Sequence, residues 1–482
     1  MKNKTRRIAT LFLAALLLLT NMASPAAGAR EPGGPLRAVV LYEDGAGPEE
    51  MARALEEAEG VTLLCCYESL FQGAAVEAEP RALAALEKLP GVAGVGLAQT
   101  YEPASSSGDG EALSPEEGLK LMKADGLWEQ GYTGDGTVIA VLDSGLNTSH
   151  EAFADGSLMK SPALSREDVA EFTQKGGTKG RYVSQRIPFA YDYYSRDDDV
   201  STTNNHGTHV TALAAGYVRD RMGRVTFRGA APAAQILSMK IFPNGSGGGT
   251  DDTIILRALE DAWNLGADVV NLSVGTGAGF SGSDTIGGIY CRAFEQMAQS
   301  GVIVCCAAGN SASSVQGKSW GKPLPSGSYT DYGSVCSPGS FYGAMAIAAA
   351  SQARLGKAGA ADYSSWGPGS GVHLSPALTA FGGPVTSAGA ASDQQYRVDE
   401  GTSMASPYAA GCCAVLLQSL RERGFTDKQE AAALVLGLLA GRARLITERG
   451  VPVSPRRQGA GFIDLEDAVS GSLAVMDPLI EL

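Results

Sequence analysis

The sequence predicts an α/β fold, in which a parallel sheet flanked by helices follows a small α+β block. The first observation is a set of continuous apolar, β-branched runs, of which residues 137–142 are the clearest. Such runs are typical of parallel strands buried on both faces. The second is that these runs alternate with helical segments, as a sheet covered on both sides requires. The third is a count of 62 glycines, which suits many tight strand-to-helix turns.

The larger part of the chain supplies the parallel sheet. After the strand at 137–142, a helix of small residues is expected to begin near residue 206. Further strands are expected at 236–241, 269–274, 302–306 and 344–350, and further helices at 253–265 and 288–299. The carboxyl ends of parallel strands meet at one edge of a sheet, so functional groups are expected there.

The chain between residue 30 and residue 104 carries a different pattern. Strands are expected at 38–42, 61–67, 71–78 and 92–97, with helices at 48–59 and 80–89. This βαββαβ order indicates a ferredoxin-like domain at 30–104. The serine- and glycine-rich stretch that follows predicts a flexible linker at 105–113. The main domain is then expected at 114–470, and a C-terminal tail at 471–482.

Composition and the chain ends narrow the class of protein. A hydrophobic content of 44% and a charged content of 19% indicate a globular protein, and a net charge of −14 argues against nucleic acid as a partner. Residues 1–29 resemble a secretory signal, with a basic start, an apolar stretch at 8–19 and the small residues Ala27-Gly28-Ala29. A membrane anchor is the alternative, but that apolar stretch is short for a bilayer span. We therefore expect a secreted, extracellular protein.

The eight cysteines do not suggest a disulfide framework. Six form adjacent pairs inside apolar runs, at 65–66, 305–306 and 412–413, where they are expected to be small core residues. Cys291 and Cys336 are the two without a cysteine neighbour, and a bridge between them stays open. No Cys-x-x-Cys is present, so a zinc site is not expected.

The strongest functional signal is the segment Gly401-Thr402-Ser403-Met404-Ala405-Ser406-Pro407. It places a serine at a glycine-led turn before a tightly packed helix. A serine hydroxyl is a weak nucleophile at neutral pH, so it needs a base, a group that orients the base, and donors for the oxyanion. Of four histidines, His206 begins the small-residue helix, and Asp143 ends the strand at 137–142. His206 with His209 is also half of a metal-site pattern, but two ligands do not complete a site.

The chain order Asp143, His206, Ser403 resembles that of the subtilisin-like serine proteases, the subtilases. The resemblance implies that Ser403 attacks a peptide carbonyl, that His206 is its base and that Asp143 orients the base. Ala307-Ala308-Gly309-Asn310 matches the family's oxyanion segment, which implies that Asn310 donates its side-chain amide to the oxyanion. The implied fold is a subtilisin-like parallel sheet. The domain at 30–104 resembles the family's inhibitory propeptide, with self-cleavage expected between about residues 100 and 115.

The same resemblance assigns substrate-binding segments. Ser273-Val274-Gly275 matches the segment that pairs with bound peptide as an added strand, and Ala307, Ala308 and Gly309 are expected beside the substrate. The glycines from 275 to 279 leave a nucleotide loop as the alternative, although they lack the Gly-x-Gly-x-x-Gly spacing. Asp197-Asp198-Asp199 leaves a structural calcium ion open, with a solvated loop as the alternative. The chemistry itself is expected to need no cofactor.

Several segments resemble the lactocepin and C5a-peptidase branch of the family. They are residues 187–199, 363–368, 374–380 and 458–464. Two features depart from that branch. Ala380-Phe381-Gly382 replaces the usual Ala-Pro-Gly, and only 92 residues lie between Asn310 and Ser403, too few for the branch's large insertion. The chain is also expected to lack the branch's C-terminal domains, so the substrates of those enzymes are not carried over.

The sequence therefore predicts a secreted bacterial serine endopeptidase that is made as a precursor and processes itself. A narrow processing peptidase of one bacterial peptide or surface protein stays open, and so does a non-catalytic, peptide-binding pseudoprotease. The expected partners are polypeptide substrates and the chain's own propeptide, acting as inhibitor and folding aid. No nucleic acid and no permanent membrane anchor are expected.

Overall fold

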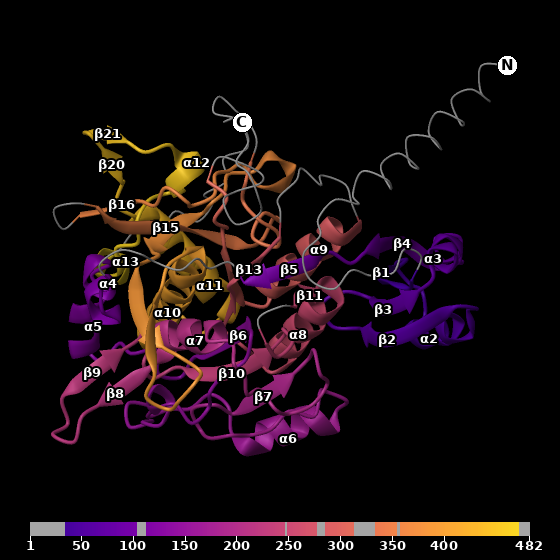
Figure 1. Ribbon diagram of the computed structural model, residues 1–482, viewed down its shortest axis with the longest axis horizontal. Coiled ribbons are helices and arrows are strands. Elements are labelled where there is room, and N and C mark those ends of the chain that lie inside the picture. Colours follow the sequence, from indigo (N-terminus) through magenta and orange to yellow (C-terminus); the bar gives the residue numbers. More distant parts are fainter. Residues whose placement is uncertain are drawn as a thin grey trace. The chain divides into compact units, whose positions relative to one another are not determined.

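The computed structural model describes residues 34–103, 112–245, 248–276, 285–312, 333–353 and 357–471 (Figure 1). The signal segment expected at 1–29, most of the expected linker and the tail after Gly471 lie outside these residues. The chain divides into two compact units, Met1–Gly34 and Pro35–Leu482, and nearly all described residues belong to the second. Within the described residues, no helix has both the length and the apolar character that crossing a membrane takes.

The N-terminal block, residues 34–103, contains a four-stranded antiparallel sheet and two helices, in the βαββαβ order that the sequence predicts. Its elements are β1 (Leu36–Tyr42), α2 (Pro48–Glu57), β2 (Val61–Tyr67), β3 (Gly73–Ala78), α3 (Pro80–Leu86) and β4 (Val92–Leu97). The strand order is β2-β3-β1-β4, which is the ferredoxin-like arrangement. Leu55 of α2 and Leu83 of α3 share a buried cluster with Val40 and Val76 of the sheet. The block ends with a further strand, β5 (Thr100–Pro103).

The main sheet has eight strands, and most of its neighbouring pairs are parallel. Its strands are β6 (Val138–Asp143), β7 (Phe189–Asp192), β10 (Gln235–Lys240), β12 (Val269–Leu272), β14 (Ile303–Ala307), β15 (Met345–Ala353), β16 (Lys357–Ala360) and β17 (Leu378–Phe381). The order is β16-β15-β14-β12-β6-β10-β7, with β17 beside β15, and only β16 runs antiparallel to its neighbour. The predicted α/β class with a helix-flanked parallel sheet is confirmed.

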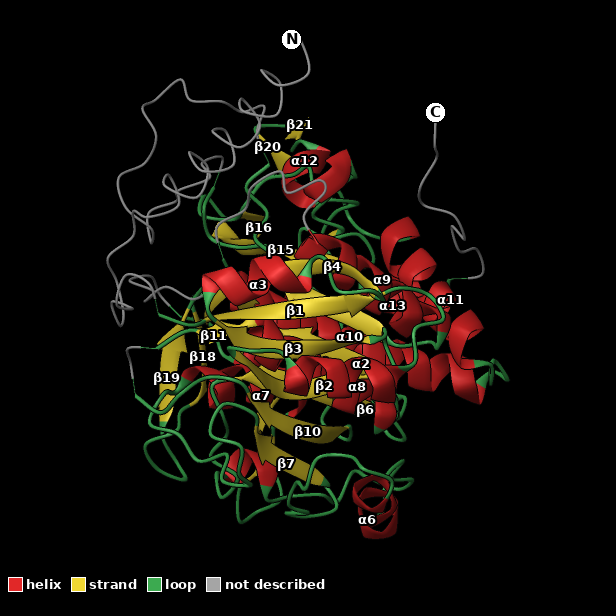
Figure 2. Ribbon diagram, turned by 90° about the vertical axis from the view of Figure 1, so that its right-hand side faces the viewer, coloured by secondary structure: helices red, strands yellow, loops and turns green. Residues whose placement is uncertain are grey.

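Helices cover both faces of this sheet (Figure 2). One buried cluster joins α7 (His206–Ala215) and α10 (Thr402–Glu422) to Ile139 and Val141 of β6. The other joins α8 (Asp252–Asn264) and α9 (Thr285–Gln299) to the alternate residues Val138, Ala140 and Leu142. Successive side chains of a strand point to opposite faces, so a strand that is apolar throughout is buried on both sides.

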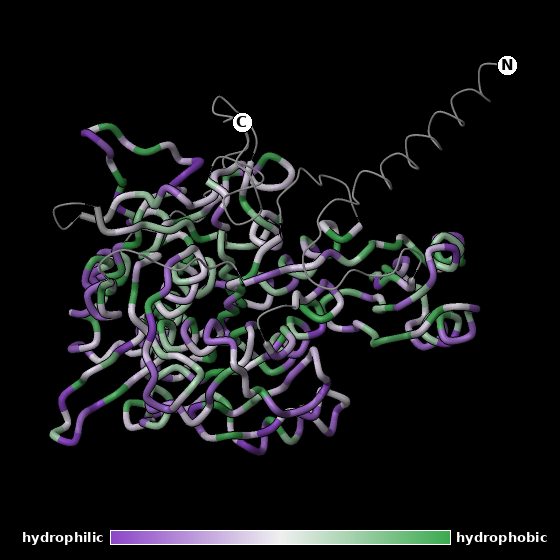
Figure 3. Tube along the Cα trace, viewed as in Figure 1, coloured by the Kyte–Doolittle hydropathy of each residue, from purple (hydrophilic) through white to green (hydrophobic). Residues whose placement is uncertain are grey.

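The remaining elements lie around this core. They are α4 (Pro115–Leu121), α5 (Asp125–Glu129), η1 (Glu151–Phe153), α6 (Arg166–Gln174), β8 (Tyr217–Arg219), β9 (Val225–Arg228), β11 (Thr250–Asp251), β13 (Val274–Gly275), η2 (Ser370–Val372), β18 (Val385–Ala388), β19 (Tyr396–Asp399), α11 (Lys428–Gly441), β20 (Thr447–Glu448), β21 (Val451–Pro452), α12 (Pro455–Gln458) and α13 (Leu465–Ser470). Peripheral α6 is mostly hydrophilic, whereas α10 in the interior is mostly apolar (Figure 3).

None of the eight cysteines, all of which lie within the described residues, forms a disulfide. Those at 305–306 and 412–413 are buried core residues, as the sequence predicts. Cys336 is buried and Cys291 is partly buried, and the bridge between them that the sequence left open is not formed. Burial raises the pKa of the Cys336 thiol to about 12, so this residue behaves as a small apolar side chain.

The close packing of α10 against its neighbours predicts a strong effect at Gly411. A Cβ there would lie 2.5 Å from Ala230 Cβ and 2.8 Å from the Ala214 carbonyl oxygen, and neither atom belongs to a flexible side chain. We expect Gly411→Ala to lower the free energy of unfolding by about 1–3 kcal/mol through overpacking. Urea unfolding in a Ser403→Ala background, which lacks the serine expected to be the nucleophile, measures this.

Gly288 of α9 is the matched control for this change. It is also a helical glycine, but among the described residues no atom outside its own stretch of helix lies within 4 Å of an added Cβ. Gly288→Ala should raise the free energy of unfolding by up to about 1 kcal/mol through helix propensity alone. Equal stability of the two alanine variants would contradict the close packing of α10.

Candidate active site

Asp143 and His206 meet at the carboxyl edge of the main sheet. Asp143 is the last residue of β6, and His206 is the first residue of α7. His206 Nδ1 lies 2.8 Å from Asp143 Oδ1, and the two side chains are only 4% and 2% exposed. The pairing therefore lies in a low-dielectric setting, where a charge on one partner strongly affects the other.

The loop after β6 holds the start of α7 against it. Ser144 N–H donates to Asp143 Oδ1 at 2.6 Å, and Ser144 Oγ accepts from Gly207 N–H at 2.9 Å. A Cβ on Gly207 would come within 2.1 Å of the Gly145 carbonyl oxygen. Only glycine allows this approach, and the approach brings the His206 imidazole to the aspartate.

The surroundings of His206 favour its protonated form. Burial alone lowers the pKa of the imidazole, but the charge and hydrogen bond of Asp143, helped by the charge of Asp399, outweigh burial and raise it above its usual value. Asp399 is the last residue of β19 and pairs with Arg397 at 2.7 Å. Within the described residues, the other ring nitrogen, Nε2, is buried and makes no hydrogen bond.

Ser403 lies in the first turn of α10, next to the segment that contains β13. Its Oγ donates to the Ser273 carbonyl oxygen at 3.1 Å, and Ser273 Oγ donates to the Ser403 carbonyl oxygen at 2.9 Å. That carbonyl lacks its usual helical donor because Pro407, four residues on, has no N–H. Two hydrogen bonds, one donated from each side, therefore hold the first turn of α10 to the loop at Ser273. Gly401, which precedes the turn, has φ of 148°, a conformation that favours glycine.

Asn310 follows β14 and faces the same turn. Its Oδ1 accepts from Thr402 N–H and from Thr402 Oγ1, each at 3.0 Å. Thr402 Oγ1 in turn accepts from Gly309 N–H at 2.9 Å. Because an amide carries its oxygen and its NH₂ group on opposite sides, these bonds direct the Asn310 NH₂ group away from Thr402.

An extended segment of the chain itself lies beside these residues. β5 pairs antiparallel with β11 on one side and with β13 on the other, so three short strands lie together (Figure 1). On the β13 side, Pro103 is opposite Val274 and Glu102 is opposite Gly275. Val274 and Gly275 thus hold an extended segment of this chain as an added strand.

The other residues expected beside a substrate make bonds within the body of the protein. Ala307 ends β14, and Ala308 N–H donates to the Ile347 carbonyl oxygen at 3.0 Å. Gly309 N–H is used by Thr402, as described above. These bonds position the Asn310 loop, and the expected contact of the three residues with substrate stays a prediction. The strand contacts of β5 come from β13 and β11.

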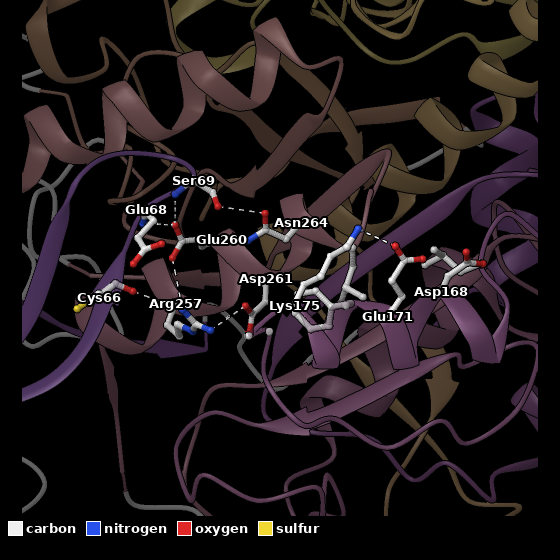
Figure 4. Close-up of a pocket in the computed structure, with 15 residues that line it drawn as sticks. Cys66, Glu68, Ser69, Asp168, Glu171, Lys175, Arg257, Glu260, Asp261 and Asn264 are labelled. Carbon is white, nitrogen blue, oxygen red and sulfur yellow. Dashed lines mark hydrogen bonds and ion pairs between the residues drawn. The ribbon is translucent and has the colours of Figure 1, made fainter. Parts of the chain in front are cut away.

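A second contact with the N-terminal block lies at α8, beside a cavity of about 650 Å³ (Figure 4). Glu260 Oε1 accepts from the backbone N–H groups of Glu68 and Ser69 at 2.7 and 2.6 Å. Arg257 lies 3.5 Å from Glu260 and 3.2 Å from Asp261. A carboxylate that accepts two N–H groups and faces a guanidinium is a strong, charge-assisted anchor.

The residues suggested for calcium form local turns. Asp197 Oδ1 accepts from Asp199 N–H, and Asp199 Oδ1 accepts from Ser201 N–H, each at 2.9 Å. Across the described residues, no group of three or more His, Cys, Asp or Glu side chains is arranged to hold a metal ion. A bound calcium ion stays a prediction. The nucleotide-loop alternative at 275–279 lies mostly outside the described residues, and Gly275 itself pairs with β5.

Three features of the site were missed from the sequence. Thr402 orients Asn310, Asp399 acts on His206, and β11 forms the second edge beside β5. Thr402 adjoins the serine and could have been weighed as its neighbour. Asp399 and β11 had no signal, because one side chain in a turn-rich region and a two-residue strand after glycines are not distinctive.

Comparisons with known proteins agree with this geometry. A family model described as the subtilase family matches residues 134–461. The PI-type proteinase of Lactococcus lactis subsp. cremoris is 32% identical over 238 residues, which cover 48% of this chain and 12% of that protein. The C5a peptidase of Streptococcus pyogenes serotype M6 is 31% identical over 252 residues, which cover 52% of this chain and 20% of that protein. The chain therefore matches less than two thirds of the length of either relative.

A solved structure extends the likeness of fold over nearly the whole chain. The crystal structure of fervidolysin from Fervidobacterium pennivorans, a keratinolytic enzyme related to subtilisin, superposes with a TM-score of 0.63. The match covers 93% of this chain and 63% of that one at 19% identity, so it shows a shared fold.

The charges around His206 predict how its pKa responds to substitution. Its pKa should lie above the usual value, and Asp399→Asn should lower it, because the variant removes a negative charge and leaves Arg397 unpaired. Imidazole NMR signals followed against pH in a Ser403→Ala background measure this. His373, whose pKa burial lowers and Asp399 does not influence, is the internal control. An unchanged His206 titration in Asp399→Asn would contradict the assignment.

Proposed function

This chain belongs to the subtilase family, and we propose that it acts on polypeptides as a secreted serine endopeptidase with Asp143, His206 and Ser403 as its catalytic triad. The observation that carries the proposal is the 2.8 Å pairing of His206 Nδ1 with Asp143 Oδ1 at the carboxyl edge of the main sheet. The family match supports peptide hydrolysis. The chain order and the buried pairing of His206 with Asp143 support these three residues as the catalytic triad.

In the proposed mechanism, Ser403 Oγ attacks the peptide carbonyl carbon while its proton passes to His206 Nε2. Asp143 holds the ring through Nδ1 and stabilises the imidazolium, which agrees with the raised pKa of His206. His206 then gives the proton to the leaving amine, and the C–N bond breaks. Water, deprotonated by His206, hydrolyses the acyl-enzyme and restores Ser403. No cofactor enters these steps.

Before attack, the Ser403 hydroxyl has to turn. In the structure it donates to the Ser273 carbonyl oxygen, so the proposed mechanism requires it to leave this acceptor and donate to His206 Nε2. Catalytic hydrogen bonds often tighten only when substrate is in place. For the oxyanion, the donors are the Asn310 NH₂ group and the Ser403 backbone N–H. The bonds of Thr402 to Asn310 Oδ1 support this role, because they fix the amide plane.

The N-terminal block acts, in this proposal, as an inhibitory propeptide that leaves by self-cleavage. Two contacts support it: β5 occupies the path of an extended peptide, and Glu260 anchors the turn at Glu68 and Ser69. Pro103 is opposite Val274, and Val274 adjoins Ser273, whose carbonyl oxygen receives the Ser403 hydroxyl. We therefore place the cleaved bond after the next residue, Ala104, which lies outside the described residues.

Secretion is proposed from the sequence of residues 1–29. A basic start, a short apolar stretch and small residues at the expected cleavage point support export through a removable signal. The proposed self-cleavage then follows export, so the active enzyme would appear outside the cell.

Ser403→Ala tests the nucleophile and self-processing together. The wild-type precursor should lose its N-terminal block, and the processed protein should react with a fluorophosphonate probe, because an activated serine attacks phosphorus. The variant should stay unprocessed and unlabelled, with peptide hydrolysis reduced roughly 10⁶-fold. Intact mass spectrometry and probe labelling measure both effects.

Ser419→Ala is the matched control, because Ser419 is also a buried serine of α10 but lies near the other end of the helix. This variant should be processed and labelled like the wild type. Loss of the N-terminal block from purified Ser403→Ala would contradict self-cleavage. Wild-type processed protein that takes up no probe would contradict the enzyme.

A further inference from the structure

Pro407 interrupts the hydrogen bonding of α10 at the proposed nucleophile. In a regular helix, the N–H of each residue donates to the carbonyl oxygen four residues before it. Pro407 is four residues after Ser403 and has no N–H, so it cannot supply that bond. Ser403 is 0% exposed, so its carbonyl oxygen is also shielded from bulk water. A buried carbonyl without a donor costs about 1–3 kcal/mol.

The hydroxyl of Ser273 supplies the missing donor from a different part of the chain. Its Oγ donates to the Ser403 carbonyl oxygen at 2.9 Å. Ser273 is buried and lies between the end of β12 and the start of β13. The bond therefore joins the residue that carries the nucleophile to the loop that leads into the strand paired with β5.

Asn271 fixes the direction of this hydrogen bond. A carbonyl oxygen only accepts, so the single hydrogen of Ser273 Oγ has to point at Ser403. In its other contact, with Asn271 Nδ2 at 3.0 Å, Ser273 Oγ therefore accepts. Asn271 Oδ1 accepts in turn from Ser406 Oγ at 2.7 Å. The buried amide is thus held from both ends, and only one arrangement of the hydrogens satisfies every member.

The bond from Ser273 Oγ persists while the nucleophile reacts. Ser403 Oγ donates to the Ser273 carbonyl oxygen at 3.1 Å, and in the proposed mechanism it leaves that acceptor for His206 Nε2. The bond from Ser273 Oγ instead uses the main-chain carbonyl of Ser403, so it does not depend on where the side chain points. It therefore holds the main chain of Ser403, including the N–H proposed as an oxyanion donor.

We propose that Ser273, directed by Asn271, is a positioning residue for the nucleophile: its hydroxyl replaces the helical donor that Pro407 lacks and keeps Ser403 in place for attack. The inference rests on the proposed function of Ser403. It gives the Ser273 side chain a role of its own, apart from the main-chain contact with substrate that is expected of this segment. Misplacement of a reacting group slows the reaction of bound substrate, so the loss of this bond should act on kcat.

The alternative is that the Ser273 hydroxyl only satisfies a buried carbonyl. Its loss would then lower the free energy of unfolding and leave each folded molecule fully active. Rates expressed per active site distinguish the two roles, because unfolded molecules are not counted. Titration with a fluorophosphonate probe gives the number of active sites.

Ser273→Ala removes the hydroxyl and keeps the main chain of the loop. The processed variant is titrated and then given a peptide with the sequence of residues 99–108, whose cleavage is followed by mass spectrometry. We expect kcat per active site to fall about tenfold to a hundredfold, the scale of one buried hydrogen bond, while KM changes by less than about twofold. Asn271→Leu removes the donor to Ser273 at similar volume. It should also lower kcat, and it serves if Ser273→Ala does not fold.

Pro407→Ala provides the rescue, because alanine restores an N–H four residues after Ser403. The double variant Ser273→Ala/Pro407→Ala should recover most of the kcat that Ser273→Ala loses, with Pro407→Ala alone as its reference. The matched control is Ser273→Ala/Ser419→Ala. Ser419 is another buried residue of α10, near the other end of the helix, so this change should recover nothing.

The outcomes separate this inference from the proposed function. A wild-type processed protein that neither takes up the probe nor cleaves the peptide overturns the proposed function. A labelled Ser273→Ala enzyme with the wild-type kcat, or one in which only KM changes, overturns the inference alone. Failure of Pro407→Ala to restore kcat in the double variant also overturns it.

Discussion

The main-chain pairing of β5 with β11 and β13 is the constraint on which the proposed chemistry depends. It fixes where each residue of an extended peptide lies relative to the serine, because Val274 faces Pro103 and the adjacent Ser273 receives the Ser403 hydroxyl. Main-chain hydrogen bonds between strands form whatever the side chains are, while successive side chains of a strand point to opposite sides. In β5 this alternation buries Tyr101 and leaves Glu102 exposed. In the proposed function, the register therefore decides which bond is cut.

The nucleophile is held to the same strands by a buried network. Ser406 Oγ donates to Asn271 Oδ1 at 2.7 Å, and Asn271 Nδ2 donates to Ser273 Oγ at 3.0 Å. Ser273 Oγ in turn donates to the carbonyl oxygen of Ser403. That carbonyl has no helical donor because Pro407 lacks an N–H. A buried polar network with every member paired is rigid, whereas one lost partner is costly. The first turn of α10 is thus fixed against β12 and the loop after it. The same loop leads into β13, so the serine and a peptide paired with β13 are positioned by one segment.

The fold was predictable from the sequence because local patterns and long-range packing agree. The apolar run before Asp143 is a central parallel strand, and the small residues after His206 form the helix that packs on α10. Asp143 and Asn310 lie at one edge of the sheet for the same reason, since Asp143 ends β6 and Asn310 follows β14. Their catalytic roles rest on the family and remain proposals.

What the sequence could not provide depends on contacts between distant segments. Asp399 and His206 are far apart in the chain, and nothing local marks that aspartate as a partner of the imidazole. Likewise, Asp252 looks like an ordinary residue at the start of a helix, and only the packing of the N-terminal block places the Gln99 N–H against it. The bond from Gly309 N–H to Thr402 is a further contact between distant segments that the sequence did not indicate. Register and tertiary contact, which composition does not encode, settled each case.

The amino-terminal residue of the processed enzyme tests the central claim most directly, because it reports which bond β5 presents to Ser403. Purified wild-type precursor is allowed to process, and the new end is identified by sequencing and intact mass. The register of Pro103 opposite Val274 predicts that the processed chain begins at Ser105. A first cut at any other bond, or the same cut in the Ser403→Ala protein, would contradict the account.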